Sequence, residues 1–348
     1  MLARVAYLNA GTDGPLPARA IGAARAELDR EAAEGRTMAH FERRGELGDG
    51  LREAYASALR CPAEDVALTT CTTEGMGQVV MGLDLRPGDE ILTSDEEHPG
   101  LLGQLAAARD VKGAVVRLVP FHRIHEEVGP QTRLVACSHV SWATGAFAPA
   151  ELAEVEVPVL LDGAQGIGAV EVDVTKLGCD AYAGAGQKWM CGPDGSGALW
   201  VAPELRERLA VTRRGYGNLQ EANEGMDALL QPDGRRFDAP SLSAEALACS
   251  LAAAAVLEEF GWEAVWERAR TLAARLREIL AAAGREPVGR GGGTLVSFPS
   301  PDAEGERAAL AEQGVAIRNI PGRPWLRASV GAWNDEGDLE RLVGSLSR

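Results

Sequence analysis

The sequence predicts an α/β fold: a large domain with a mainly parallel sheet and a smaller α+β domain at the C-terminal end. Two observations favour this class. Short apolar runs alternate with segments of helical periodicity, and a polar turn follows the buried strand expected at residues 157–161. Asp162 opens that turn, where open parallel sheets place the groups that face a ligand. A length of 348 residues is sufficient for two domains.

The composition is that of an ordinary globular protein, with 46% hydrophobic and 25% charged residues. The 35 Lys and Arg against 51 Asp and Glu give a formal charge of −16, which disfavours nucleic acid and anionic membranes as partners. No apolar run approaches the length of about 18 residues needed to span a bilayer, and the first residues lack a signal-peptide pattern. The six cysteines contain no CxxC pair and the five histidines are dispersed, so we expect a cytoplasmic protein without a metal site.

The elements of the first part follow from periodicity and turn residues. An extended segment at Tyr7–Gly11 ends at the Gly- and Pro-containing residues 14–17, and helices are expected at residues 18–34 and 48–59. Apolar strand runs follow at residues 66–69, 91–93, 115–119, 134–137, 157–161, 180–183 and 197–201. We expect these runs to form the sheet of the large domain.

The last part of the chain has a different pattern. A short polar helix is expected at residues 203–211, and residues 213–234 have few apolar positions, which indicates a mobile loop. A long helical pattern at residues 244–283, interrupted at Gly261, leads into the smaller domain. That domain is expected to contain strands at 294–298, 315–317 and 325–329, a helix at 303–312 and a final helix after Asn334.

A lone lysine, Lys188, lies in a glycine-rich loop between Gly186 and Gly192 and belongs to no amphipathic helix face. Taken singly, Asp162 is an ordinary turn residue and Lys188 is a solvated charge. A fixed carboxylate together with a desolvated lysine is what pyridoxal phosphate (PLP) catalysis requires, with the lysine as Schiff base and the acid on the pyridinium nitrogen. Nucleotide motifs are absent: no G-x-x-x-x-G-K-[ST] occurs, and Trp189 occupies the third glycine position of a G-x-G-x-x-G.

Three stretches carry a family resemblance: DGAQ at residues 162–165, LGCDAY at 177–182 and GQKWMCGPDGSGALWV at 186–201. They resemble the signature of the class V aminotransferases, which include cysteine desulfurases, selenocysteine lyases and isopenicillin N epimerase. The resemblance implies the PLP-dependent transferase fold type I, with a mainly parallel seven-stranded sheet in the large domain. The large PLP-binding domain and the small domain that it implies are residues 15–240 and residues 1–14 with 241–348.

The resemblance also implies roles at the cofactor. Lys188 forms the Schiff base, and Asp162 binds the ring nitrogen, its pKa depressed by the adjacent cation. The ring of His98 lies on the pyridine and shuttles a proton, with a surface loop histidine as the alternative. Gln165 donates a hydrogen bond to the phenolic oxygen of the ring.

The phosphate contacts are expected at the start of a helix. Thr72 and Thr73 follow the strand at 66–69, and exposed N–H groups at a helix start form an anion site, although a capping threonine without a ligand is the alternative. Ser241 matches the family threonine that reaches the phosphate of a neighbouring subunit. Two positions near the lysine depart from the family pattern: Gln187 stands where a histidine is usual among the cofactor contacts, and Ala185 replaces a hydroxyl residue.

Three residues are assigned to the substrate by the same resemblance. Arg327 matches the arginine that holds the substrate α-carboxylate, a role that suits a planar guanidinium; a surface arginine is the alternative. Asn9 belongs to a segment beside that carboxylate or to an ordinary turn. Trp142 falls where cysteine desulfurases carry an asparagine, and it lines the pocket or packs in the core. The expected partners are an amino acid substrate and a second copy of the chain, in a homodimer with shared active sites.

The expected reaction is aminotransferase or C–S lyase chemistry at the Cα of an amino acid. Residues 317–324 occupy the region where cysteine desulfurases display a catalytic cysteine, and no cysteine occurs after Cys249. A persulfide-forming cysteine desulfurase is therefore not expected. An epimerase of the isopenicillin N epimerase type and a non-catalytic PLP-binding regulatory module remain as alternatives.

Overall fold

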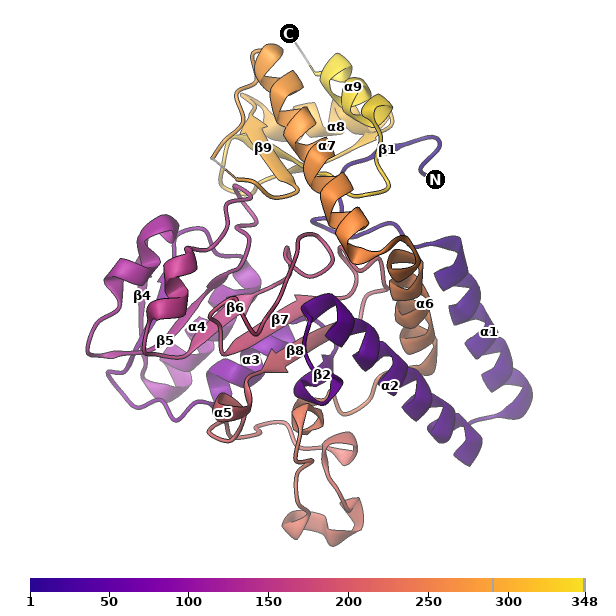
Figure 1. Cartoon of the computed structure of the whole chain (residues 1–348), viewed down its shortest axis with the longest axis vertical. Coiled ribbons are helices and arrows are strands. Elements are labelled where there is room, and N and C mark those ends of the chain that lie inside the picture. The colour runs from indigo at the N-terminus through magenta and orange to yellow at the C-terminus, as the bar shows by residue number, and fades with distance from the viewer. Residues whose placement is uncertain (290, 347–348) are drawn as a thin grey trace.

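A seven-stranded sheet in the order β2-β8-β7-β6-β5-β3-β4 organises the molecule (Figure 1). The computed structural model describes residues 1–289 and 291–346. β8 runs antiparallel to both of its neighbours and the other pairs are parallel, which confirms the α/β class with a mainly parallel sheet. The strands are β2 (Val66–Thr69), β3 (Glu90–Ser94), β4 (Val115–Val119), β5 (Thr132–Ser138), β6 (Val159–Asp162), β7 (Ala181–Ala185) and β8 (Gly197–Val201).

Both faces of this sheet are covered, and successive strand residues enter different cores. Leu161 of β6 packs in the core that α2 and α6 cover, whereas Leu160 packs in the core that α3 and α4 cover. Strands that are buried on both faces read as continuous apolar runs, which explains why no alternation marks them in the sequence. The helices of the two layers are α1 (Ala18–Glu34), α2 (Met38–Leu59), α3 (Thr72–Gly82), α4 (Pro99–Lys112) and α6 (Ala244–Phe260), with α1 packed on α6.

A second, smaller group of elements lies at the top of Figure 1, where α7 (Trp262–Ala282) leads into it. The N-terminal β1 (Ala6–Tyr7) pairs in parallel with β10 (Val315–Ala316), so the first residues join the C-terminal part of the chain. An antiparallel sheet in the order β11-β12-β9 shares its core with α7 and the last helices. These further elements are β9 (Leu295–Pro299), β11 (Arg318–Asn319), β12 (Trp325–Ser329), α8 (Ala303–Glu312) and α9 (Glu336–Ser345).

Three helices differ from the sequence prediction, and one of them, α4 (Pro99–Lys112), was not expected at all. The second helix begins at Met38 and not at residue 48. Residues 38–46 of it are exposed or half-buried, and Arg43 links them to α1 through an ion pair with the buried Glu27, at 3.0 Å. The helix expected at 203–211 is only the single turn α5 (Pro203–Arg206). Short 3₁₀ turns complete the chain at η1 (Ala63–Asp65), η2 (Phe121–Glu127), η3 (Ala150–Glu154), η4 (Tyr216–Asn218), η5 (Ala222–Asp227) and η6 (Gly234–Phe237).

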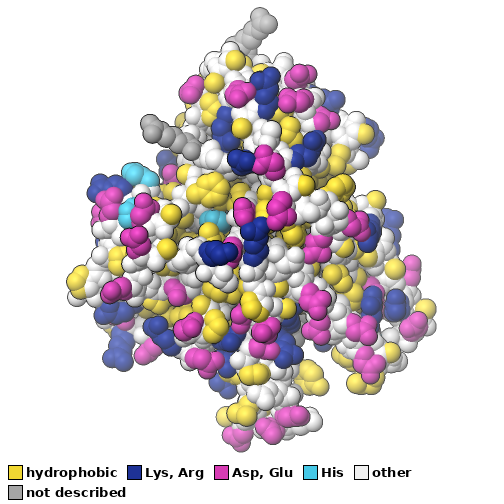
Figure 2. Space-filling model, viewed as in Figure 1, with side chains coloured by type: hydrophobic (Ala, Val, Ile, Leu, Met, Phe, Trp, Pro, Cys, Tyr) yellow, Lys and Arg dark blue, Asp and Glu magenta, His cyan; other side chains and the backbone are white. Residues whose placement is uncertain are grey.

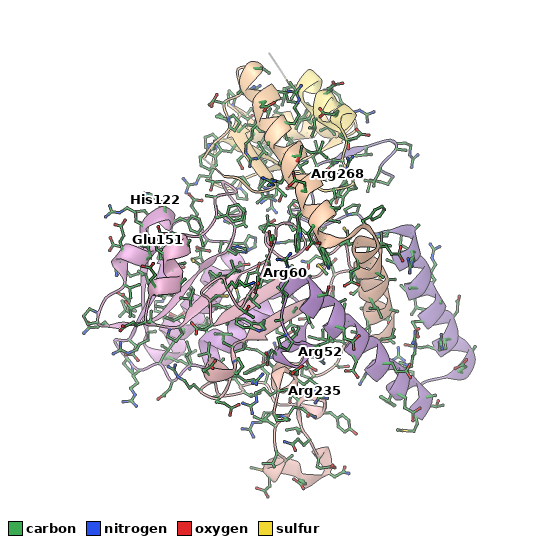
Figure 3. The ribbon with its side chains drawn as sticks, viewed as in Figure 1. Arg52, Arg60, His122, Glu151, Arg235 and Arg268 are labelled. Carbon is green, nitrogen blue, oxygen red and sulfur yellow. The ribbon has the colours of Figure 1, made fainter. Side chains whose placement is uncertain are left out.

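The segment that contains η4 and η5 projects from the body at the bottom of Figure 1 and carries exposed apolar side chains, Tyr216, Met226 and Leu229. The chain that follows this segment is anchored by Arg52 of α2 (Figure 3), whose Nη2 lies 2.8 Å from Oδ2 of Asp238 in a partly buried ion pair. The Leu68 N–H of β2 also donates to the Asp238 carboxylate, at 2.8 Å. Asp238, three residues before Ser241, is therefore bound to both α2 and the edge strand β2 of the large sheet.

Acidic and basic side chains are interspersed over the face shown in Figure 2. Within residues 1–289 and 291–346, no helix is both long and apolar enough to cross a membrane. The same part of the chain contains no cluster of three or more His, Cys, Asp or Glu side chains that could hold a metal ion.

Candidate active site

A cavity of about 190 Å³ lies where the seven-stranded sheet meets the small antiparallel sheet. One wall comes from the ends of the large-sheet strands and the loops after them, with Asp162 and Lys188. The opposite wall comes from the small sheet, with Arg318 of β11 and Arg327 of β12. Residues that are far apart in the sequence therefore face a single cavity.

Asp162 is the last residue of β6, and its side chain is only 5% exposed. Its Oδ1 accepts a hydrogen bond from the Ala164 N–H at 2.9 Å, which fixes the carboxylate at the C-terminal end of the strand. Burial raises the pKa of this carboxyl, and the nearby Lys188 cation opposes the rise without cancelling it. Desolvation thus outweighs one neighbouring cation in the protein alone, and the expected depression of this pKa by an adjacent ring cation remains a prediction.

Lys188 lies in the turn after β7 and is half-buried. Its carbonyl accepts from the Cys191 N–H at 3.1 Å, and the carbonyl of Gln187 accepts from the Gly14 N–H at 2.8 Å. A Cβ on Gly14 would lie 1.9 Å from the Lys188 carbonyl oxygen, so only glycine permits this close approach. Burial lowers the pKa of the Lys188 amine to about 8, with Asp162 opposing the change.

The start of α3 forms a corner of the cavity that suits an anion. Cys71 is the N-cap residue, its side chain accepts no hydrogen bond from the helix, and both Thr72 and Thr73 line the cavity. The first N–H groups of a helix lack partners within the helix and carry the positive end of its dipole. Backbone donors, two hydroxyls and the dipole together can bind a phosphate group.

His98 and Trp142 form a neighbouring wall. Their rings meet edge to face, with centroids 5.1 Å apart. The Gly100 N–H donates to Nδ1 of His98 at 3.0 Å, which assigns the proton of the neutral ring to Nε2. Burial and then the cations of Lys188 and two arginines lower the pKa of His98 to about 4. The ring is therefore neutral at pH 7 in the absence of an added anion.

Two glutamines complete the wall on the side of the lysine. Gln165 is buried, donates through Nε2 to the Gly11 carbonyl at 2.8 Å and accepts at Oε1 from Nε1 of Trp189 at 2.9 Å. These two bonds hold the amide with its second N–H unassigned, available to a ligand. Oε1 of Gln187 is buried without a hydrogen-bond partner in the part of the chain that the structure describes.

Arg327 is 0% exposed, an unusual position for a guanidinium. Its Nη1 donates to the Trp142 carbonyl at 2.7 Å, whereas Nε and Nη2 have no partner among the described residues. Burial and the neighbouring Arg318 cation lower the pKa of Arg327 to about 9. A buried cation with two free donors is costly unless a ligand anion binds to it.

Two of the predicted site residues do not line the cavity. Asn9 accepts at Oδ1 from the Thr12 hydroxyl at 2.9 Å, and it thereby supports the turn that brings Gly11 and Thr12 to the wall. Ser241 is exposed and absent from the wall of this chain.

Sequence reasoning missed several residues of the wall. Gly11, Thr12, Cys71 and Ala164 adjoin predicted residues, so proximity to those motifs was an available signal. Arg318 lies in residues 317–324, the region that the resemblance places at the catalytic cysteine of desulfurases, so this too was an available signal. The wall residues that the sequence did not predict are Gly11, Thr12, Cys71, Met76, Ala164 and Arg318.

Comparison with known proteins identifies related chains. A family model described as "Aminotransferase class-V" matches residues 6–342. A probable cysteine desulfurase of Pseudomonas aeruginosa is 34% identical over 326 residues, which cover 82% of this chain and 78% of that protein. An isopenicillin N epimerase of Amycolatopsis lactamdurans is 31% identical over 389 residues, covering 98% of this chain and 94% of that protein.

Solved structures extend the likeness to the whole fold. A complex between the cystine C–S lyase C-DES and its reaction product cysteine persulfide matches with a TM-score of 0.91 at 28% identity, covering 99% of this chain and 97% of that one. The cysteine desulfurase CsdA of Escherichia coli matches with a TM-score of 0.85 at 25% identity, covering 99% and 94%. Another C-DES structure has glycine covalently linked to the PLP cofactor.

Proposed function

Since the chain belongs to the class V aminotransferase family, we propose that it is a PLP-dependent enzyme that cleaves the C–S bond of a sulfur-containing amino acid. One observation carries the proposal: a half-buried lysine, a buried aspartate and a buried arginine with free donors face the same cavity. PLP chemistry uses these three groups for the Schiff base, the ring nitrogen and the substrate carboxylate.

The residues of the cavity fit PLP. The uncapped start of α3 with Thr72 and Thr73 would hold the phosphate, and Asp162 would hold the ring nitrogen. A protonated ring nitrogen would add a second cation near Asp162 and favour its ionised form, against the effect of burial. His98 and Gln165 would contact the ring, and Gln187 has an orphaned buried oxygen that a donor would satisfy. When bound, PLP supplies an electron sink for the charge that develops at Cα.

The protein groups then divide the chemistry between them. Arg327 binds the α-carboxylate and thereby orients the Cα–H bond. Lys188 takes the Cα proton at Nζ, and its lowered pKa of about 8 makes the neutral amine accessible near physiological pH. The electron pair of the Cβ–S bond leaves with the sulfur. For L-cystine and water, the products that balance the atoms are pyruvate, ammonia and cysteine persulfide.

We favour release of the sulfur-bearing product over its transfer to a cysteine of this chain. The relatives named cysteine desulfurase support C–S bond cleavage in general, and the cystine C–S lyase is the structural match that releases a persulfide. Cys71 is the only thiol on the wall among the described residues, and it lies at the proposed phosphate corner. No cysteine occurs after Cys249.

Epimerisation is the second candidate, because the isopenicillin N epimerase aligns with 98% of this chain. It needs the same proton removal at Cα but returns the proton to the opposite face. The two reactions differ in products. Pyruvate from L-cystine indicates lyase chemistry, whereas deuterium exchange at Cα with inversion and no pyruvate indicates an epimerase.

The cofactor proposal is tested by labelling. The chain has only three lysines, Lys112, Lys176 and Lys188, so borohydride reduction after incubation with PLP followed by peptide mapping is decisive. We expect the label on Lys188 and its loss in Lys188→Ala. Lys176→Ala is the matched control, since this lysine is exposed and pairs with Asp173 on the surface. A label on Lys112 or Lys176 alone would contradict the proposal.

We also propose a cytoplasmic homodimer with shared active sites. Exposure of Ser241 supports it, because a residue that serves a neighbouring cavity must be free on the surface of its own chain. Mixing inactive Lys188→Ala and Ser241→Ala chains is expected to restore activity, whereas a monomer in light scattering would contradict the dimer.

A further inference from the structure

The turn at residues 141–146 follows β5 of the large sheet and is bound to the small sheet. Its Trp142 carbonyl accepts from Nη1 of Arg327 on β12 at 2.7 Å. Its Ala143 carbonyl accepts from the hydroxyl of Ser297 on β9 at 2.5 Å. Nε and Nη2 of Arg327 have no partner among the described residues, and they form one edge of the guanidinium. The bond to the turn therefore determines that this edge, which can bind a carboxylate bidentately, is the free one.

A carboxylate of the large domain closes the same turn from its other side. Glu96, in the loop after β3, is half-buried, and its Oε2 accepts from the hydroxyls of Ser141 and Thr144, the second at 2.7 Å. Both hydroxyl residues are buried. Within the turn, Oγ of Ser141 also accepts from the Thr144 N–H at 3.1 Å. A single oxygen atom of Glu96 thus binds the turn on both sides of Trp142.

The loop that carries Glu96 is itself bound to β5. The next residue, Glu97, is buried, and its Oε2 accepts from the Ser138 N–H at 2.9 Å and from the Ser138 hydroxyl at 2.7 Å. Ser138 is the last residue of β5 and the register partner of Asp162 on β6. Glu96 therefore extends from a backbone that is fixed to the large sheet, and its carboxylate can determine where the turn lies.

We propose that Glu96 is a positioning residue for substrate binding. It places the Trp142 carbonyl through the turn at residues 141–146, and this carbonyl sets the edge of Arg327 that faces the substrate. Glu96 lies outside the cavity wall that the described residues form, so it acts through the turn and does not contact the substrate. This inference rests on the proposed function, in which Arg327 binds the α-carboxylate, and it identifies the group that prepares that site.

The first measurement uses the protein without cofactor. Hydrogen–deuterium exchange in peptides that contain residues 141–146 reports opening of the turn, because N–H groups of the turn bond within it. Glu96→Ala should speed this exchange by about tenfold, the scale of a lost hydrogen bond to a charged group. Glu96→Gln retains an acceptor oxygen and should exchange as the wild-type protein does. Asp95→Ala is the matched control, because Asp95 is in the same loop but accepts from the Phe121 N–H at 3.1 Å.

The second measurement uses PLP-loaded protein and two ligands that differ only in the carboxylate. L-alanine and ethylamine are titrated against the absorbance of the protein. Glu96→Ala should raise the Kd of L-alanine by about tenfold and leave the Kd of ethylamine unchanged, because only L-alanine has a carboxylate for Arg327. Glu96→Gln and Asp95→Ala should keep both values. Thr144→Val, which removes one donor to Glu96, should give a smaller effect of the same kind and replaces Glu96→Ala if that variant does not fold.

Three results would overturn the inference. The first is faster exchange of the turn with an unchanged Kd for L-alanine, and the second is equal weakening of L-alanine and ethylamine. The third is an equal effect of Glu96→Ala and Asp95→Ala, which would indicate general destabilisation of the loop. Absence of a borohydride label on Lys188 overturns the proposed function and this inference together, whereas a label on Lys188 with any of the three results overturns this inference alone.

Discussion

Single residues set the geometry of the substrate side of the cavity. Gly11 packs against two groups of the wall: a Cβ on this residue would lie 2.8 Å from Nη2 of Arg327 and 2.7 Å from Oγ of Ser329. Both distances are shorter than van der Waals contact, so a side chain at this position must displace the guanidinium, the hydroxyl or both. The free donors of Arg327 depend on the absence of one methyl group.

Gly11→Ala is therefore expected to weaken substrate binding more than stability. We expect KM to rise by about tenfold, because a shift of the guanidinium loses a charge-assisted hydrogen bond to the substrate carboxylate. Steady-state kinetics and thermal unfolding measure the two effects. Gly22→Ala is the control, since nothing lies within 4 Å of its Cβ position on α1, and it should leave KM unchanged. An unchanged KM in Gly11→Ala would argue against Arg327 as the carboxylate site.

The protonation of Lys188 predicts a pH dependence of cofactor uptake. Only the neutral amine reacts with an aldehyde, and burial lowers the pKa of Lys188 to about 8. The uptake rate of cofactor-free protein should rise with pH through a midpoint near 8 and then level off, as followed by stopped-flow absorbance. Asp162→Asn removes the carboxylate that opposes the shift, so its midpoint should move to lower pH. A midpoint near 10.5, the ordinary lysine value, would contradict the burial of this amine.

At the scale of elements, the start of α3 lacks a stabilising side-chain cap and thereby keeps N–H donors free for a ligand. Ser, Thr, Asp and Asn are the side chains that cap a helix well, yet Cys71 occupies the N-cap and accepts no helix N–H. Its backbone donors thus remain open beside Thr72 and Thr73. A helix that capped itself fully would offer fewer donors to a phosphate.

Cys71→Asp should separate these two properties. An aspartate at the N-cap is expected to raise the free energy of unfolding of cofactor-free protein by about 0.5–1 kcal/mol. The same negative charge should raise the Kd for PLP by at least about tenfold through repulsion of the phosphate. Urea unfolding and absorbance titration provide the two numbers, with Cys71→Ala as the uncharged control. Tighter binding of PLP by Cys71→Asp would show that the phosphate lies elsewhere.

At the scale of the whole molecule, the cavity joins two sheets that have separate cores. The connection includes Arg268 of α7 (Figure 3), whose Nε and Nη2 donate to the carbonyls of Ala332 and Asn334 at 2.8 Å. These bonds tie the connecting helix to the loop that follows β12. A ligand that contacts both walls adds a further link between the two groups of elements.

Binding of PLP should therefore raise the Tm of the whole chain in a single transition. At a free concentration of 100 times the Kd, mass action predicts about 2.7 kcal/mol of added stability. Differential scanning calorimetry measures the shift, and Lys188→Ala should show a smaller one because the covalent link is lost. Two separate transitions, of which only one shifts on addition of PLP, would contradict a ligand that contacts both walls of the cavity.

The sequence by itself determined the α/β class, the strands of the large sheet and the family, because apolar runs and the motif around Asp162 and Lys188 are local features of the chain. It also named most of the wall that the fold assembles. The boundaries at residues 14/15 and 240/241, the roles of the site residues and the contribution of Ser241 to a second subunit remain predictions.

Only the tertiary structure decided the rest. The pairing of Arg318 with Arg327 depends on strand register, which no local pattern encodes. The first turns of α2 carry Arg43, which pairs with Glu27 of α1, a contact between two helices that no local pattern encodes. The direction of the Asp162 pKa depends on how much water the surrounding fold removes. Each of these is a property of groups brought together from distant parts of the chain, and only folding brings them into contact.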